Sequence, residues 1–153
     1  MDRFAGFNRV KLLGATVIVA IIGAIALAIP AYTDRLRRDQ VLEAFQNLSD
    51  IQAWMEGFYK HYRNYARGDL CGAAVVPEDR ARYFTYACAV DTTAGAAPGQ
   101  SYKATATGKS CPMAGFAFAI DEKKARATLS IPSDWGALPA SAGSIWVDRK
   151  GIK

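Results

Sequence analysis

The chain has 153 residues, which suits one domain with an appendage and excludes two full domains. Its net charge of +5 is a modest excess that permits contact with DNA or anionic lipid without requiring either. Three cysteines, none of them in a CxxC spacing, allow at most one disulfide within the chain.

The first predicted element is a helix of membrane-spanning length. Residues 1–11 are polar and basic, whereas Leu12 to Thr33 carry no Asp, Glu, Lys or Arg. About twenty apolar residues suffice to cross a bilayer as a helix. Positive charge before an apolar segment keeps that end cytoplasmic, so the chain after Pro30 is expected in the periplasm or outside the cell. Disulfides persist in those compartments.

Beyond Pro30 the helical pattern resumes and becomes amphipathic, so the proline is expected to kink the helix rather than end it. The predicted apolar stripe over residues 31–65 consists of Val41, Phe45, Leu48, Ile51 or Gln52, Met55, Tyr59 and Tyr62. The predicted polar face consists of Arg38, Glu43, Gln46, Asn47, Asp50 and Lys60. A helix with these two faces is expected to dock on a sheet and to end near residues 64–68.

After Gly68 the apolar residues alternate, which is typical of strands. The predicted strands cover 83–90, 101–107, 115–120 and 127–131, with 144–148 as a last short strand. Residues 121–124 suit a turn, and residues 91–100 and 132–143 suit loops. Together these patterns predict an α+β fold, in which one long helix packs on a small antiparallel meander.

Several segments resemble the type IV pilin family. Gly6-Phe7 ahead of the apolar helix resembles a prepilin processing site, and residues 20–32 (AIIGAIALAIPAY) resemble the pilin N-terminal helix. Four further segments resemble PilE-type minor pilins, a group that includes ComP-like receptors for DNA uptake sequences. They are 83–88 (YFTYAC), 101–109 (SYKATATGK), 113–121 (MAGFAFAID) and 130–136 (SIPSDWG).

The resemblance implies a precursor in the bacterial inner membrane that later enters an extracellular pilus. Residues 1–6 would be a leader removed by prepilin peptidase, with Phe7 as the new, methylated N-terminus. Residues 7–30 would be the transmembrane and assembly helix, and residues 31–153 the extracytoplasmic globular domain. The implied partners are other pilin subunits and the inner-membrane assembly machinery, and the implied roles are adhesion, twitching motility or DNA uptake.

The resemblance also bears on the cysteines and on one missing carboxylate. Cys71 and Cys88 match a family disulfide, the alternative being two buried thiols, and Cys111 is expected to be a half-buried thiol. The family has a glutamate shortly after the cleavage glycine, which is thought to neutralise the terminal amine of a neighbouring subunit. Here the chain between Gly6 and Asp34 has no acidic residue, so a tip or initiating position in the filament is a hypothesis.

The sequence predicts no enzymatic chemistry, no metal and no cofactor. The single histidine, His61, is expected to be structural or solvent-facing, and zinc-ligand spacing and phosphate-binding glycine loops are absent from the sequence. A set of basic residues is the remaining candidate site, as phosphate contacts for double-stranded DNA. Its members are Lys103, Lys109, Lys123, Lys124 and Arg126. The same residues also suit an ordinary solvated sheet face, where lysines oppose aggregation.

Three interpretations therefore remain. The first is a structural, minor pilin subunit, the second is a pilin that also receives DNA, and the third is a secreted or periplasmic binding protein. The third depends on Ala26-Leu27-Ala28, which resembles a signal peptidase site and would give a mature start at Ile29. The mature N-terminus separates the first and third interpretations.

Overall fold

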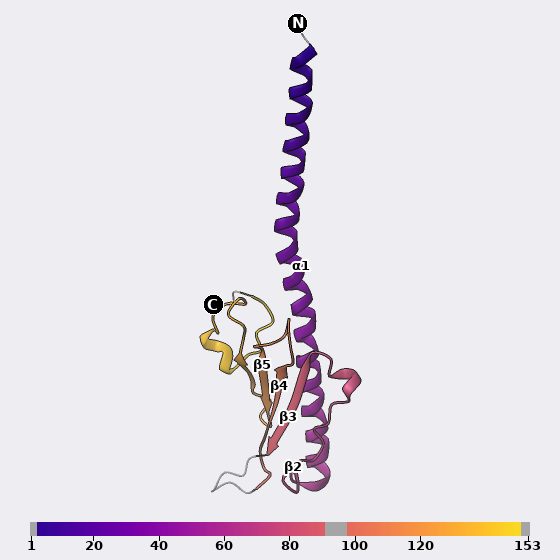
Figure 1. The fold of residues 1–153 in the computed structure, drawn as a ribbon. Coiled ribbons are helices and arrows are strands. Elements are labelled where there is room, and N and C mark those ends of the chain that lie inside the picture. The colour runs from indigo at the N-terminus through magenta and orange to yellow at the C-terminus, as the bar shows by residue number, and fades with distance from the viewer. Residues whose placement is uncertain (1–2, 91–97, 151–153) are drawn as a thin grey trace. The chain divides into compact units, whose positions relative to one another are not determined.

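The computed structural model describes residues 3–90 and 98–150, with side chains from Tyr32 onward. The chain divides into two compact units, residues Met1–Leu36 and Arg37–Lys153. The first unit contains only the beginning of helix α1, which spans Arg3–Tyr62, and the second contains the rest of that helix and all the strands (Figure 1).

The backbone of α1 is helical through Pro30, so the proline does not end the helix, as predicted. Gly6 and Phe7 lie within α1, but their side chains and the rest of the predicted apolar segment 7–30 fall outside the described side chains. Among the described residues, none of the helices is long and apolar enough to cross a membrane. Processing at Gly6 and membrane insertion therefore remain predictions.

The second half of α1 buries one face, as its periodicity predicts. Val41, Leu48, Ile51 and Met55 are fully buried, and Phe45 and Tyr59 are half-buried against the same core. Tyr62, predicted to be part of this stripe, is 68% exposed. The helix ends there because the next residue takes a left-handed conformation with φ of 55°, so the predicted end near residues 64–68 is slightly late.

One residue of the predicted polar face is buried. Asn47 is only 2% exposed, although it was assigned to the solvent side of the helix. Its amide nitrogen donates to the backbone oxygen of Arg80 at 2.7 Å and to the hydroxyl of Tyr86 at 2.9 Å. The prediction was wrong because a segment some thirty positions away, which no helical period can reveal, covers this flank of α1.

The four-stranded antiparallel meander is confirmed (Figure 1). Its strands, paired in chain order, are β3 (Phe84–Val90), β4 (Tyr102–Gly108), β5 (Ala117–Asp121) and β6 (Arg126–Ser130). The inner face of the sheet packs on α1 through aromatic contacts, for example Phe45 with Phe118 at 4.9 Å between ring centroids. Helix and sheet thus form the two layers around one core.

The predicted strand at 144–148 is wrong. A short 3-10 helix, η2 (Ala140–Gly143), precedes this segment, which then runs in irregular conformation beside β6. The hydroxyl of Thr128 donates to the backbone oxygen of Ile145 and accepts from the backbone N–H of Val147, both at 2.9 Å. A side chain therefore makes the bonds that a backbone ladder would otherwise provide.

A short hairpin, with two residues in each strand, precedes the sheet and was not predicted. It pairs β1 (Ala66–Arg67) with β2 (Leu70–Cys71), and a 3-10 turn, η1 (Glu78–Arg80), follows it. The disulfide between Cys71 and Cys88 joins this hairpin to β3, which is the pairing that the family resemblance implies. Cys111 is free and exposed, so the expectation of a half-buried thiol was wrong.

Candidate nucleic-acid interface

The outer face of the sheet carries small side chains. Tyr102, Ala104 and Ala106 of β4 are buried toward the helix, so the alternate residues point outward. These outward residues are Lys103, Thr105 and Thr107. Their partners on β3 are Ala89, Ala87 and Thr85. Between the ends of β4 this surface therefore consists of alanine and threonine side chains. Thr85, Ala87 and Thr107 are exposed there, Thr105 is partly exposed, and its β5 partner Ala119 is buried.

Three of the predicted DNA-binding lysines gather at one end of β4. Lys103 is paired with Asp121 on the neighbouring strand β5. Lys123 and Lys124 occupy the exposed turn between β5 and β6. One carboxylate oxygen of Asp121 accepts the backbone N–H of Lys123 at 2.9 Å, so this acid shapes the turn. The Lys123 ammonium lies 4.0 Å from Glu122. Two carboxylates among three cations weaken the positive potential here.

Lys109 lies at the opposite end of β4. Its side-chain nitrogen donates to the backbone oxygen of Ala81 at 2.5 Å. Its backbone N–H donates to the backbone oxygen of Tyr83 at 2.9 Å. These bonds place Lys109 beside the exposed residue Arg82, which the sequence analysis did not select. A distance of about 20 Å separates Lys103 from Lys109 along the strand, at roughly 3.3 Å per residue.

Arg126 does not belong to this surface, contrary to the prediction. It is opposite Ile120, whose side chain is buried, so Arg126 shares the helix-facing side of the sheet. Its guanidinium lies 4.7 Å from the ring centroid of Trp146, which in turn stacks on Phe45. This arrangement is a cation–π contact at the edge of the core.

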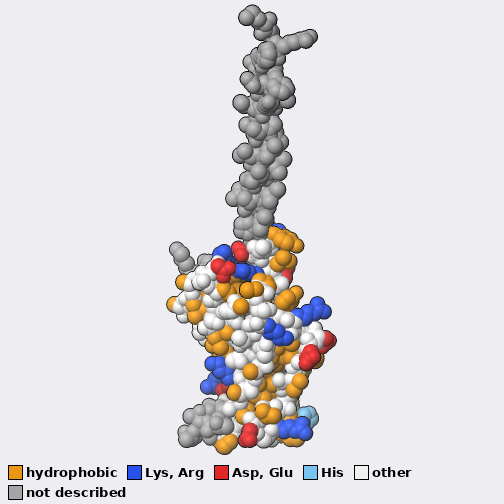
Figure 2. Space-filling view, in the orientation of Figure 1, with side chains coloured by type: hydrophobic (Ala, Val, Ile, Leu, Met, Phe, Trp, Pro, Cys, Tyr) orange, Lys and Arg blue, Asp and Glu red, His pale blue; other side chains and the backbone are white. Residues whose placement is uncertain are grey.

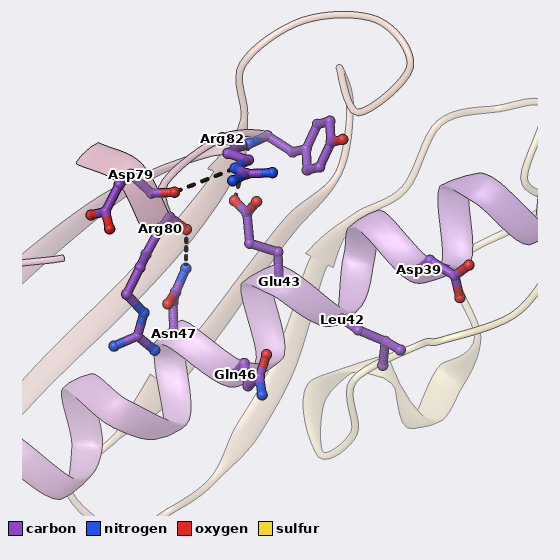
Figure 3. Close-up of a pocket in the computed structure, with 9 residues that line it drawn as sticks. Asp39, Leu42, Glu43, Gln46, Asn47, Asp79, Arg80 and Arg82 are labelled. Carbon is purple, nitrogen blue, oxygen red and sulfur yellow. Dashed lines mark hydrogen bonds between the residues drawn. The ribbon is translucent and has the colours of Figure 1, made fainter. Parts of the chain in front are cut away.

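A groove of about 320 Å³ lies between α1 and the segment around η1 (Figure 3). Asn47 anchors this segment through its bond to Arg80, and the carboxylate of Glu43 accepts the backbone N–H of Tyr83 at 3.0 Å. Arg80 also forms an ion pair with Asp50. Because acidic side chains line the groove as well as basic ones, it suits a structural junction better than a phosphate site.

The hydroxyl of Tyr86 contacts Asn47 and Glu43 of α1 beside this junction, and it stays protonated at neutral pH. Burial raises its pKa well above the usual value near 10, and the charge of Glu43 acts in the same direction. The hydrogen bond from Asn47 opposes these effects without cancelling them. The neutral hydroxyl is therefore kept as a donor to the backbone oxygen of Glu43, at 3.3 Å.

No constellation for metal chemistry occurs in the described parts of the chain, where groups of three or more His, Cys, Asp or Glu side chains do not gather. His61 is exposed, in agreement with the solvent-facing alternative. The residues that the structure brings together on the sheet are cations and hydroxyls, with Asp121 and Glu122 at one end. The cations and hydroxyls can bind phosphate, but nothing in this set suits a nucleophile with its base.

A long N-terminal helix packed on an antiparallel meander, with a disulfide joining the intervening hairpin to the sheet, is consistent with the type IV pilin class. Residues 30–115 match a family described as type IV minor pilin ComP, DNA uptake sequence receptor. The match covers more than half of the chain, which therefore belongs to this family of minor pilins that act in DNA uptake. Comparisons with curated proteins and with solved structures gave no match.

The matched region includes only part of the predicted DNA-binding set. Lys103 and Lys109 lie inside residues 30–115, whereas Lys123, Lys124 and Arg126 lie beyond them. The two matched lysines are those at the two ends of β4.

Proposed function

We propose that this minor pilin binds double-stranded DNA along the outer face of β4. The observation that carries the proposal is the exposure of Lys103 and Lys109 at the two ends of the strand, with only small side chains between them. Phosphates are contacted by lysines and by hydroxyl groups, and Thr85 and Thr107 supply exposed hydroxyls on this face.

The spacing of the lysines suits a nucleic-acid backbone. A strand of DNA has one phosphate per about 3.4 Å along the axis, so a separation of about 20 Å corresponds to roughly six phosphates. Lys109 uses one of its three N–H donors on Ala81, which leaves two for a phosphate oxygen. Lys123 and Lys124 extend the surface beyond Lys103, although Asp121 and Glu122 reduce their contribution.

The proposed binding protein is also a filament component. In this proposal the subunit is cut after Gly6, enters the filament through residues 7–30 and presents residues 31–153 outside the inner membrane, with no catalytic role. Support comes from membership of the minor pilin family and from the prepilin-like Gly6-Phe7 pair. N-terminal sequencing of the mature protein tests this part: Phe7 is expected, and Ile29 would indicate a signal-peptide-cleaved binding protein instead.

DNA binding is tested with the purified full-length chain and a fluorescent duplex of about 20 base pairs, by anisotropy over about 50 to 300 mM salt. The logarithm of the association constant should fall linearly with the logarithm of the salt concentration, and the slope of this line is the quantity compared between variants. Lys103→Ala and Lys109→Ala should each weaken binding and reduce the slope by about 0.9, because each removes one phosphate contact.

Arg126→Ala is the matched control, since it removes a cation from the other side of the sheet. The expected slope for this variant equals that of the wild-type protein. The proposal is wrong if the duplex does not bind at low salt, or if Arg126→Ala changes the slope while Lys103→Ala and Lys109→Ala leave it unchanged.

A further inference from the structure

A row of aromatic side chains lines a groove at the C-terminal end of α1. Trp54, Phe58 and Tyr62 follow one another at four-residue spacing, so they lie along one side of the helix. Ala73, Val75 and Pro77 form the facing wall, and the groove has a volume of about 580 Å³. A second hollow of about 410 Å³ shares two of the aromatic residues. Both hollows are lined only by residues of the second compact unit.

The groove is fixed at one end and open at the other. Trp54 packs against the core, and Phe58 presses on the hairpin so closely that a Cβ at Gly72 would lie 2.2 Å from its ring. The ring centroids of Phe58 and Tyr62 are 4.4 Å apart. Tyr62 is 68% exposed and Val75 79% exposed, so these two side chains of the groove face solvent.

Two arginines lie next to this aromatic groove. Arg67 lines the second hollow, and the Arg80 guanidinium, which is also paired with Asp50, lies 5.9 Å from the ring centroid of Trp54. Figure 2 shows hydrophobic and basic side chains next to one another at the end of the domain where α1 ends. Stacking rings with adjacent positive charge suit a ligand that combines flat apolar faces with anionic groups.

We propose that this groove stacks unpaired bases at a single-stranded end of DNA. The inference rests on the proposed function for its ligand, DNA, but it uses a different surface from the outer face of β4. In a blunt duplex the base faces are covered by neighbouring pairs except at the two ends, and the paired terminal bases are too wide to enter an aromatic groove. Single strands present those faces, and they bind to platforms of aromatic side chains flanked by basic residues.

The test compares a blunt duplex with the same duplex carrying a single-stranded thymidine overhang of about six nucleotides, using the full-length chain. The overhang is expected to tighten binding about fivefold or more, which corresponds to about 1 kcal/mol from stacking. Tyr62→Ala should abolish most of this gain, and Tyr62→Phe should retain it. Neither variant should alter binding of the blunt duplex.

Tyr83→Ala is the matched control, because Tyr83 is also partly exposed but lines the groove beside η1. It should leave the overhang effect unchanged. Lys103→Ala, by contrast, should weaken the binding of both duplexes equally.

Three results would overturn the inference. Equal affinity for the blunt and overhanging duplexes would refute base stacking while leaving DNA binding on β4 intact. Failure of both duplexes to bind would refute this inference and the proposed function together. If sedimentation shows self-association that Tyr62→Ala abolishes, with DNA affinities unchanged, the groove is instead a contact between copies of the chain.

Discussion

Replacing Asn47 by alanine should destabilise the globular domain by about 2–3 kcal/mol. The change removes two hydrogen bonds, to the backbone of Arg80 and to Tyr86, from a side chain that is 2% exposed. Each bond is worth about 1 kcal/mol net, and leaving the Arg80 oxygen without its donor adds up to roughly another 1 kcal/mol. Tyr86 retains its bond to the backbone of Glu43, which limits the loss.

The assay is urea unfolding of the full-length chain, followed by tryptophan fluorescence because Trp135 is buried in the core. Gln46→Ala is the matched control: it removes an amide from the neighbouring, exposed position of the same helix. The control should stay within about 0.5 kcal/mol of the wild-type protein. Equal stabilities for Asn47→Ala and Gln46→Ala would refute the view that this amide anchors the η1 segment.

Asn47→Asp gives an independent check of the same reasoning. A carboxylate cannot donate to the Arg80 oxygen, and burial raises the pKa of a carboxyl group above its value in the unfolded chain. A raised pKa in the folded state means that stability is lost as pH rises through it. The penalty of this variant should therefore be larger at about pH 7 than at about pH 5, whereas Asn47→Ala should show no such difference.

Two further predictions concern the disulfide and the buried tyrosines. Reduction of the Cys71–Cys88 bond, which closes a loop of sequence separation 17, should lower the free energy of unfolding by about 3 kcal/mol, as measured by urea titration with and without reductant. The double variant Cys71→Ala/Cys88→Ala has no bond to reduce. If reductant lowered its free energy of unfolding by the same amount, this explanation would be contradicted. Burial raises the pKa of Tyr86, so its contribution to stability is complete below about pH 10 and decreases at higher pH. Tyr86→Phe should reduce the loss of stability between about pH 9 and pH 11, and an unchanged alkaline profile would show that Tyr86 ionises without cost.

Local periodicity determined most of the secondary structure. The four strands of the meander were predicted within two residues at each end, because inward and outward residues alternate along each of them. The outward position of Lys103 followed from the same alternation, since Tyr102 is buried. The two-residue strands β1 and β2 are too short to show any period, and they were missed.

The candidate site needed more than periodicity. Five basic residues were grouped because they fall in and around the predicted sheet. The structure instead places Arg126 on the helix-facing side, against Trp146, and separates Lys109 from the other lysines. Arg82 and the aromatic groove were not predicted, because they depend on how the segment between α1 and β3 folds over the helix. That segment has no repeating apolar pattern.

The sequence by itself therefore determined the amphipathic half of α1, the four strands of the meander and most of their buried faces, because burial of one face requires a regular spacing of apolar residues. Only the tertiary structure decided which polar residues become partners. Asn47 reaches Arg80 across 33 positions, and Thr128 reaches Ile145 across 17. Such bonds form only where two segments meet in space. The sequence around one partner does not indicate which residue the other partner is.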